Sequence, residues 1–146
     1  MIAKYFTLFI TISILYPSYD KDIKLPIYQL YNFEIDKSIN SLEEMSIEYP
    51  EDALIPFLKI SAYWQRSLLN DNPESSYKVI KDGIRQLTPF YLDMIHRYPE
   101  DQSYNLFLGS LYGLKARIHL AQSEWMSLII SGAKGFKYIK KAISED

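Results

Sequence analysis

The tetrapeptide Tyr-Pro-Glu-Asp occurs twice in this chain of 146 residues, at positions 49–52 and again at positions 98–101. The two copies are 49 residues apart, and the same offset places Met45 on Met94. A partial third copy is found at the end of the chain, in residues 138–146. Repeats with periods of roughly 20 to 50 residues indicate arrays of stacked structural units. We therefore expect one folding unit that occurs twice and begins a third time.

Large apolar side chains recur three and four residues apart along most of the chain, which is the period of one helix face. The longest such series consists of Tyr77, Ile80, Ile84, Leu87, Tyr91, Met94 and Tyr98. No segment shows the sustained alternation that a half-buried strand needs. The pattern predicts an all-α protein with helices near residues 23–33, 35–48, 53–69, 75–97, 102–122 and 124–144.

Helix ends are predicted from proline and from capping residues. Pro50 and Pro99 should each end a helix, because proline disfavours helical geometry in the residue before it. The Glu-Asp pair that follows each proline can accept backbone N–H groups at the start of the next helix. Residues 70–74 are expected to form a loop, with Ser75 or Ser76 capping the helix that follows.

Residues 1–18 are expected to be a signal peptide or an uncleaved N-terminal anchor. A lysine at position 4 precedes an uncharged apolar run at 5–16 and then Pro17, the order typical of a secretory signal. The run is shorter than the roughly twenty residues of a membrane span. An N-terminal core strand or helix is the alternative. Export would place the chain in the periplasm or outside the cell, or leave it anchored in the inner membrane.

The repeat resembles the tetratricopeptide repeat (TPR). That motif places small and large apolar residues in its second helix, followed by a proline, and a Leu-Gly-x-x-Tyr stretch in its first helix. The second-helix spacing is matched by Ser38, Leu42, Met45 and Pro50, by Leu87, Tyr91, Met94 and Pro99, and in part by Gly135, Ile139 and Ala142. The best first-helix match is Leu108, Gly109 and Tyr112. The unit of 49 residues is longer than the usual repeat of about 34.

This resemblance implies a fold and a function for residues 19–146. The fold would be an α-solenoid of antiparallel helix hairpins, about six helices in all. The function would be that of a non-enzymatic, protein-binding scaffold of the bacterial cell envelope or exterior, which binds an unidentified protein through its concave face. Candidate partner-binding residues on that face are Tyr63, Gln65, Arg66, Tyr112, Lys115 and Arg117. The alternative is a small molecule or glycan bound in a tyrosine-rich groove, since the chain has 13 tyrosines.

Composition argues against other classes. The chain has no cysteine, and neither His96 nor His119 has a partner at metal-ligand spacing, so we expect no metal and no cofactor. The 16 basic and 18 acidic residues give a net charge of −2, which does not favour nucleic-acid binding. The carboxylate pairs at 51–52 and 100–101 occupy the same place in the repeat, so they are interpreted as helix-start charges rather than catalytic groups. We expect no enzyme activity.

The last predicted helix has two further features. Its four lysines are Lys134, Lys137, Lys140 and Lys141, and they form a basic side that is either solvated or in contact with an acidic partner or lipid headgroups. The third copy also stops just before its expected proline. Because repeat arrays need a polar capping helix, we expect a truncated array or the first part of a longer one, with an apolar face exposed on this helix.

Overall fold

The structure is a computed structural model that describes residues 21–70 and 72–144. Within these residues the fold is all-helical, as predicted, and each helix lies within two residues of its expected bounds at either end. The helices are α2 (Lys21–Tyr31), α3 (Ile35–Glu48), α4 (Leu54–Leu69), α5 (Glu74–Arg97), α6 (Ser103–Ala121) and α7 (Trp125–Ile143). The predicted signal segment at 1–18 lies outside the described residues. No described helix combines the length and the apolar character that crossing a bilayer requires.

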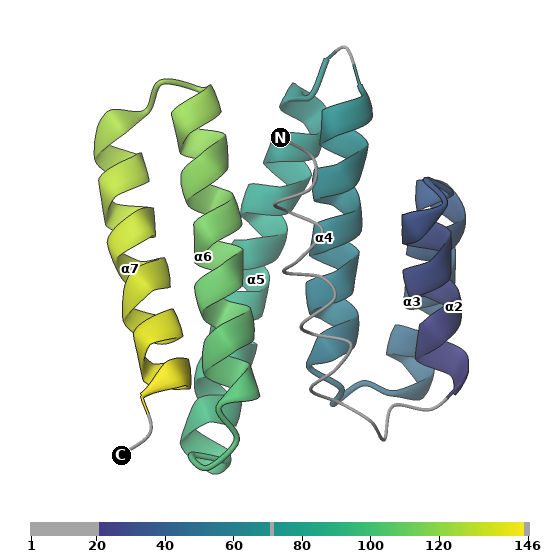
Figure 1. The fold of residues 1–146 in the computed structure, drawn as a ribbon, viewed down its shortest axis with the longest axis horizontal. Helices are drawn as coiled ribbons and strands as arrows, with labels where there is room; N and C mark the ends of the chain where they lie inside the picture. The colour runs from purple at the N-terminus through teal and green to yellow at the C-terminus, as the bar shows by residue number, and fades with distance from the viewer. Residues whose placement is uncertain (1–20, 71, 145–146) are drawn as a thin grey trace.

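The helices form three antiparallel pairs that follow one another in chain order, α2 with α3, α4 with α5 and α6 with α7 (Figure 1). Successive pairs are joined by contacts between α3 and α4 and between α5 and α6. The first helices of the second and third pairs, α4 and α6, also touch each other directly. The chain therefore advances sideways by one helix pair at a time.

The first Tyr-Pro-Glu-Asp segment forms the turn between α3 and α4. The backbone N–H of Tyr49 donates to the carbonyl of Met45 at 2.8 Å, which ends α3, and Pro50 prevents its continuation. The Asp52 carboxylate then accepts the N–H of Leu54, the first residue of α4, at 2.8 Å. The predicted role of the acidic pair at the helix start is confirmed here for Asp52.

The second copy of the segment adopts the same local structure between α5 and α6. Tyr98 donates to the carbonyl of Met94 at 2.8 Å, and the Asp101 carboxylate accepts the N–H of Ser103 at 3.0 Å. The φ and ψ angles are −129° and 67° at Tyr98 and −123° and 67° at Tyr49. Identical sequence thus gives nearly identical backbone geometry at both places where the chain passes from one pair to the next.

The turns within the first and third pairs also match. In the first, Phe33 adopts a left-handed conformation with φ of 59°, its N–H donates to Leu30, and the N–H of Glu34 donates to Gln29 at 2.9 Å. Together these two bonds form a Schellman motif, which satisfies carbonyls at a helix C-terminus. Ser123 has the same φ of 59° and the same two bonds at the end of α6.

The second pair is joined differently, through a longer loop. Helix α5 begins at Glu74, whose N–H donates to the side-chain carbonyl of Asn72 at 3.3 Å. The expectation that Ser75 or Ser76 caps this helix is wrong, because both serines already lie inside it. The residue that accepts this N–H is instead Asn72, in the loop before the helix.

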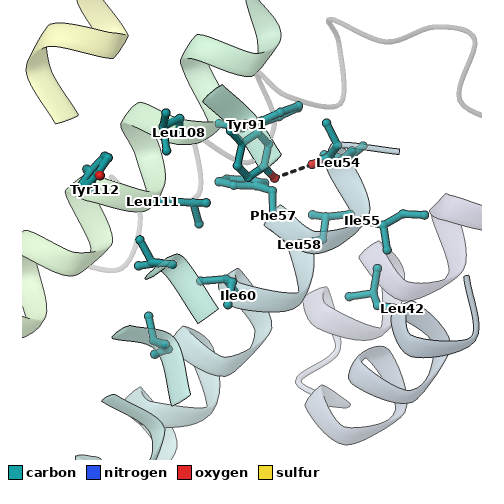
Figure 2. Packing of buried hydrophobic residues seen from close by; sticks show 14 of the residues in the cluster. Leu42, Leu54, Ile55, Phe57, Leu58, Ile60, Tyr91, Leu108, Leu111 and Tyr112 are labelled. Atoms are coloured by element: carbon teal, nitrogen blue, oxygen red, sulfur yellow. Dashed lines mark hydrogen bonds between the residues drawn. The ribbon is translucent and has the colours of Figure 1, made fainter. Parts of the chain in front are cut away.

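The main core lies between α4, α5 and α6, and Figure 2 shows its large side chains. Phe57 of α4 stacks on Phe107 of α6 with ring centroids 5.1 Å apart, and Tyr91 of α5 lies against Phe107 at 6.3 Å. The fully buried Tyr91 hydroxyl donates to the carbonyl of Ala53 at 2.7 Å, drawn dashed in Figure 2. This bond attaches α5 to the start of α4 and satisfies a buried phenol.

A smaller buried cluster joins the first pair to α4. It consists of Leu30 from α2, Ile35 and Ile39 from α3 and Ala62 from α4, with Tyr63 packed against it. Helix α4, the first helix of the next pair, therefore covers Leu30 at the end of α2 and the first turns of α3. This is how one pair conceals the apolar face of the pair before it.

The third pair has an unusually close contact between its two helices. A Cβ atom built on Gly109 would lie 2.9 Å from the backbone nitrogen of Ile139 and 3.0 Å from the carbonyl oxygen of Gly135. A Cβ on Gly135 would in turn lie 3.0 Å from the carbonyl oxygen of Gly109. Helices α6 and α7 therefore make their closest approach where Gly109 faces Gly135.

Candidate functional site

Three side chains from three helices form a stacked cluster, which we call the Trp64 cluster. The rings of Trp64 on α4 and Tyr77 on α5 are stacked, with centroids 6.5 Å apart and an interplanar angle of 20°. The Arg117 guanidinium on α6 lies over the Trp64 ring, its Cζ atom 5.8 Å from the centroid. All three side chains are half-buried, so part of each faces solvent. The arrangement combines a cation–π contact with aromatic stacking.

The antiparallel pairing of the helices brings these residues together. Trp64 lies near the end of α4, Tyr77 in the first turns of α5 and Arg117 near the end of α6. All three are therefore on the side of the molecule where the turns within the second and third helix pairs lie. Tyr77 and Trp64 also pack on the margin of the main core, which fixes their orientation. The cluster therefore holds two half-buried rings and a guanidinium next to one another at the margin of the core.

Polar side chains border the cluster on the α5–α6 side. The Lys81 ammonium donates to the side-chain carbonyl of Gln122 at 2.7 Å, and the Gln122 amide donates to the Glu74 carboxylate at 2.7 Å. On the α4 side, Leu68 and Leu69 are exposed. An apolar and aromatic centre with a polar edge is the composition typical of protein interfaces.

The three predicted site residues on α4 lie around that helix rather than on one face. Arg66 pairs with the Asp36 carboxylate of α3 and lies over the Tyr63 ring, 5.5 Å from its centroid. Tyr63 itself packs against both buried clusters. Gln65 is half-buried on a different side of the helix. Tyr63 and Arg66 thus line the contact with the first pair.

On α6 the predicted residues point to different neighbours. Tyr112 is nearly buried and stacks on Tyr138 of α7, with centroids 6.1 Å apart and an interplanar angle of 7°, while the Lys134 ammonium lies 5.5 Å from the centre of the Tyr112 ring. Burial, and then the neighbouring Tyr112, raises the pKa of the Tyr138 hydroxyl above its usual 10.0. Lys115 is half-buried. Arg117, the last of the six predicted residues, belongs to the Trp64 cluster.

Trp64 and Tyr77 were not among the predicted binding residues. Each belongs to a series of apolar residues at helical spacing, and this spacing alone assigns both rings to the core. Their positions are intermediate, because one part of each ring packs inward and another part is accessible. The aromatic–arginine stack depends on contact between α4 and α6, which sequence spacing does not give.

A small hollow lies at the first Tyr-Pro-Glu-Asp turn. Its volume is about 140 Å³, and it is lined by Ser46, Tyr49, Pro50, Asp52, Ile55, Pro56, Leu87 and Phe90. Pockets that enclose small molecules typically measure about 300–1,000 Å³. One tyrosine lines this hollow, so the tyrosines of the described chain are not gathered there.

The one buried histidine of the described chain has a structural partner. His119 at the end of α6 is hydrogen-bonded through Nδ1 to the carboxylate of Glu124, the residue before α7. This hydrogen bond is the main cause that lowers the pKa of the Glu124 carboxyl below its usual 4.5, and the nearby Lys81 lowers it further. The residues described contain no group of three or more His, Cys, Asp or Glu side chains suited to a metal ion.

Comparison with known proteins gives no assignment: no protein-family model, no curated protein and no solved structure matches the chain.

Proposed function

We propose that this chain is a TPR-like helical repeat scaffold that binds another protein through the surface formed by α4 and α6. The observation that carries this proposal is the Trp64 cluster, in which α4 and α6, the first helices of successive pairs, present Trp64 and Arg117 side by side. In helical repeat arrays the first helices commonly line the binding face. The binding face would be exported, since residues 1–18 have the order of a secretory signal.

The repeated geometry of the chain supports a scaffold. Both passages from one pair to the next are made by the same tetrapeptide with the same hydrogen bonds, at Tyr49 and at Tyr98. Each first helix then covers the second helix of the preceding pair. Stacked pairs of this kind create extended surfaces rather than deep pockets, and extended surfaces are suited to protein partners.

The residue types of the cluster support a protein partner in particular. Tryptophan, tyrosine and arginine are the residues most often found to dominate binding energy at protein interfaces. Here the stacking of Tyr77 on Trp64 and of Arg117 over Trp64 already holds the side chains in place. Less conformational entropy is therefore lost when a partner binds.

Site-specific photo-crosslinking in the native envelope fraction tests this function. A photoreactive residue at Leu68, which is exposed beside the cluster, should capture one defined protein, whereas the same residue at Leu92 on α5 should not. Leu92 is the matched control because it is also an exposed leucine on a helix. Equal capture from both positions, or none from Leu68, would contradict a binding face at α4 and α6.

A pair of arginine variants tests the role of the cluster itself. Arg117→Glu removes the cation from Trp64 and should weaken capture from Leu68 by at least about tenfold, as expected for an interface hot spot. Arg97→Glu is the control, since Arg97 also lies over a tyrosine, Tyr98, at 5.6 Å, but on α5 away from the cluster. Equal binding by both variants would show that the cluster is not the contact surface.

A further inference from the structure

Helix α7 exposes a row of large apolar side chains. Trp125, Met126, Ile129, Phe136 and Ile143 are each more than half exposed to solvent. The contact with α6 is made by a different side of the helix, where Ser131 and Gly135 are buried. The spacing of apolar residues in the sequence predicts an exposed apolar face on this helix, and these exposures confirm it.

The matched turns show which surface this row corresponds to. Phe33 and Ser123, the left-handed residues of the first and third pairs, are 90 residues apart, and the same offset places Ile35 on Trp125 and Ile39 on Ile129. In α3 these isoleucines are 6% and 4% exposed, because α4 packs next to them. In α7 their counterparts are 61% and 64% exposed. The uncovered row is therefore the surface that, in the first pair, is covered by the first helix of the next pair.

The other end of the array exposes the complementary surface. Ile23 and Ile27 of α2 pack into the core, whereas Leu25 and Tyr28, on the other side of that helix, are 54% and 66% exposed. The 90-residue offset places Tyr28 on Ile118 of α6, which is completely buried in the main core. Tyr28 thus occupies a position that is buried when a pair precedes it.

The charges of the two ends are also complementary. Residues 125–144 contain four lysines and no acidic residue, whereas the first helix pair, residues 21–48, contains six acidic residues and three lysines. Helix α2 itself has two lysines and one aspartate, so the acidic excess of this pair comes from residues 34–48, in the turn and in α3 beside it. Pairing of two α7 helices would instead bring eight lysines to one seam without a single carboxylate from either helix. Opposite charge across an interface steers association and fixes its orientation.

We infer that α7 is a docking surface for α2 of a second copy of this chain, which takes the place that α4 takes against α3. Trp125, Ile129 and Phe136 of one copy then pack against Leu25 and Tyr28 of the next. The contact is heterologous, since each copy uses two different surfaces, so copies add head to tail without closing as a twofold dimer. The Trp64 cluster takes no part, and this association is independent of the protein-binding function.

Two variants of the full chain test the inference by sedimentation velocity. The tail variant, Ile129→Lys with Phe136→Lys, blocks α7, and the head variant, Leu25→Lys with Tyr28→Lys, blocks α2. All four side chains are exposed, so the helical circular dichroism of both variants should equal that of the unmodified chain. When the protein concentration is raised to about 100 µM, we expect the unmodified chain to form species larger than a dimer. Each variant alone should remain monomeric over the same range. An equal mixture of the two variants should form a one-to-one dimer, because one intact head remains for one intact tail.

The other outcomes each overturn the inference. A head variant that still dimerises alone would show that α7 pairs with α7, and association in both variants would locate the contact elsewhere. A monomeric unmodified chain that sediments with vesicles of phosphatidylcholine and phosphatidylglycerol, and loses this binding in the tail variant, would assign α7 to an anionic lipid surface. The control variant Val79→Lys with Leu92→Lys, which changes two exposed apolar residues of α5, should associate like the unmodified chain.

Discussion

Gly109 and Gly135 face each other between α6 and α7 at a separation that leaves no room for a methyl group on either residue. The atom nearest to a Cβ on Gly109 would be the side-chain Cγ1 of Ile139 at 2.7 Å, followed by two backbone atoms, the nitrogen of Ile139 at 2.9 Å and the carbonyl oxygen of Gly135 at 3.0 Å. Backbone atoms of a packed helix cannot turn aside as a flexible side chain can. The two helices must therefore separate if either glycine is enlarged.

Gly109→Ala is thus expected to destabilise the fold by about 1–3 kcal/mol, the usual range for overpacking. Gly132→Ala on the same helix pair is the control, since a Cβ there meets nothing within 4 Å. That change should be neutral or stabilise by about 0.5–1 kcal/mol, because alanine favours the helix over glycine. Urea unfolding of both variants measures the difference, and equal effects would mean that the seam is looser than described.

Tyr91→Phe is expected to destabilise the chain by about 1–3 kcal/mol, because it leaves the carbonyl of Ala53 without the hydroxyl that donates to it. Tyr98→Phe should change the free energy of unfolding by less than about 0.5 kcal/mol, since Tyr98 is partly exposed. Thermal and urea unfolding of the two variants compare a buried with a solvated phenol. A similar loss in both would contradict the role given to the buried bond.

Glu124 should make stability depend on acid pH. Its pKa is lowered in the folded chain by the bond from His119, so its stabilising effect is present above the unfolded value of 4.5 and is lost as pH falls through the lower folded value. Glu124→Gln removes this titration. The difference in unfolding free energy between the original chain and the variant, measured from pH 7 to pH 3, should shrink below pH 4.5. A difference that stays constant across this range would be evidence against the His119–Glu124 bond.

Tyr138 should act in the opposite direction at alkaline pH. Its pKa is raised above 10.0 in the folded chain, so the neutral phenol is stabilised by folding, and this stability is lost as pH rises through the folded value. Tyr138→Phe cannot ionise and should lose less stability than the original chain between pH 9 and pH 11. Subtracting the two curves removes the contribution of the lysines, which titrate in the same range. Parallel curves would show that burial does not raise the pKa of Tyr138 in the folded chain.

Much of the fold follows from local sequence patterns. The spacing of apolar residues predicts all six described helices, and Pro50 and Pro99 mark the two passages between pairs, because both signals depend on residues close in the chain. The sequence does not show that Asn72, and not Ser75, accepts the N–H at the start of α5, since several polar residues in this loop can cap a helix. The local pattern of residues therefore predicts the position of a helix better than it predicts which side chain caps it.

The candidate site was predicted less well. Tyr63, Arg66 and Tyr112 were expected on one groove, but Arg66 turns to Asp36 on α3 and Tyr112 to Tyr138 on α7. These directions depend on which helices become neighbours and how closely they approach. The stack of Trp64, Tyr77 and Arg117 likewise exists only once three helices are in place.

The matching turns at Tyr49 and Tyr98 have a consequence for how the length of such a chain can change. The backbone leaves α3 and α5 with nearly the same angles, and equivalent hydrogen bonds start α4 and α6. A gene segment encoding 49 residues could therefore be lost or duplicated in frame without altering the geometry of the turns between pairs. The array would grow or shrink by whole helix pairs, and each remaining pair would keep its direction.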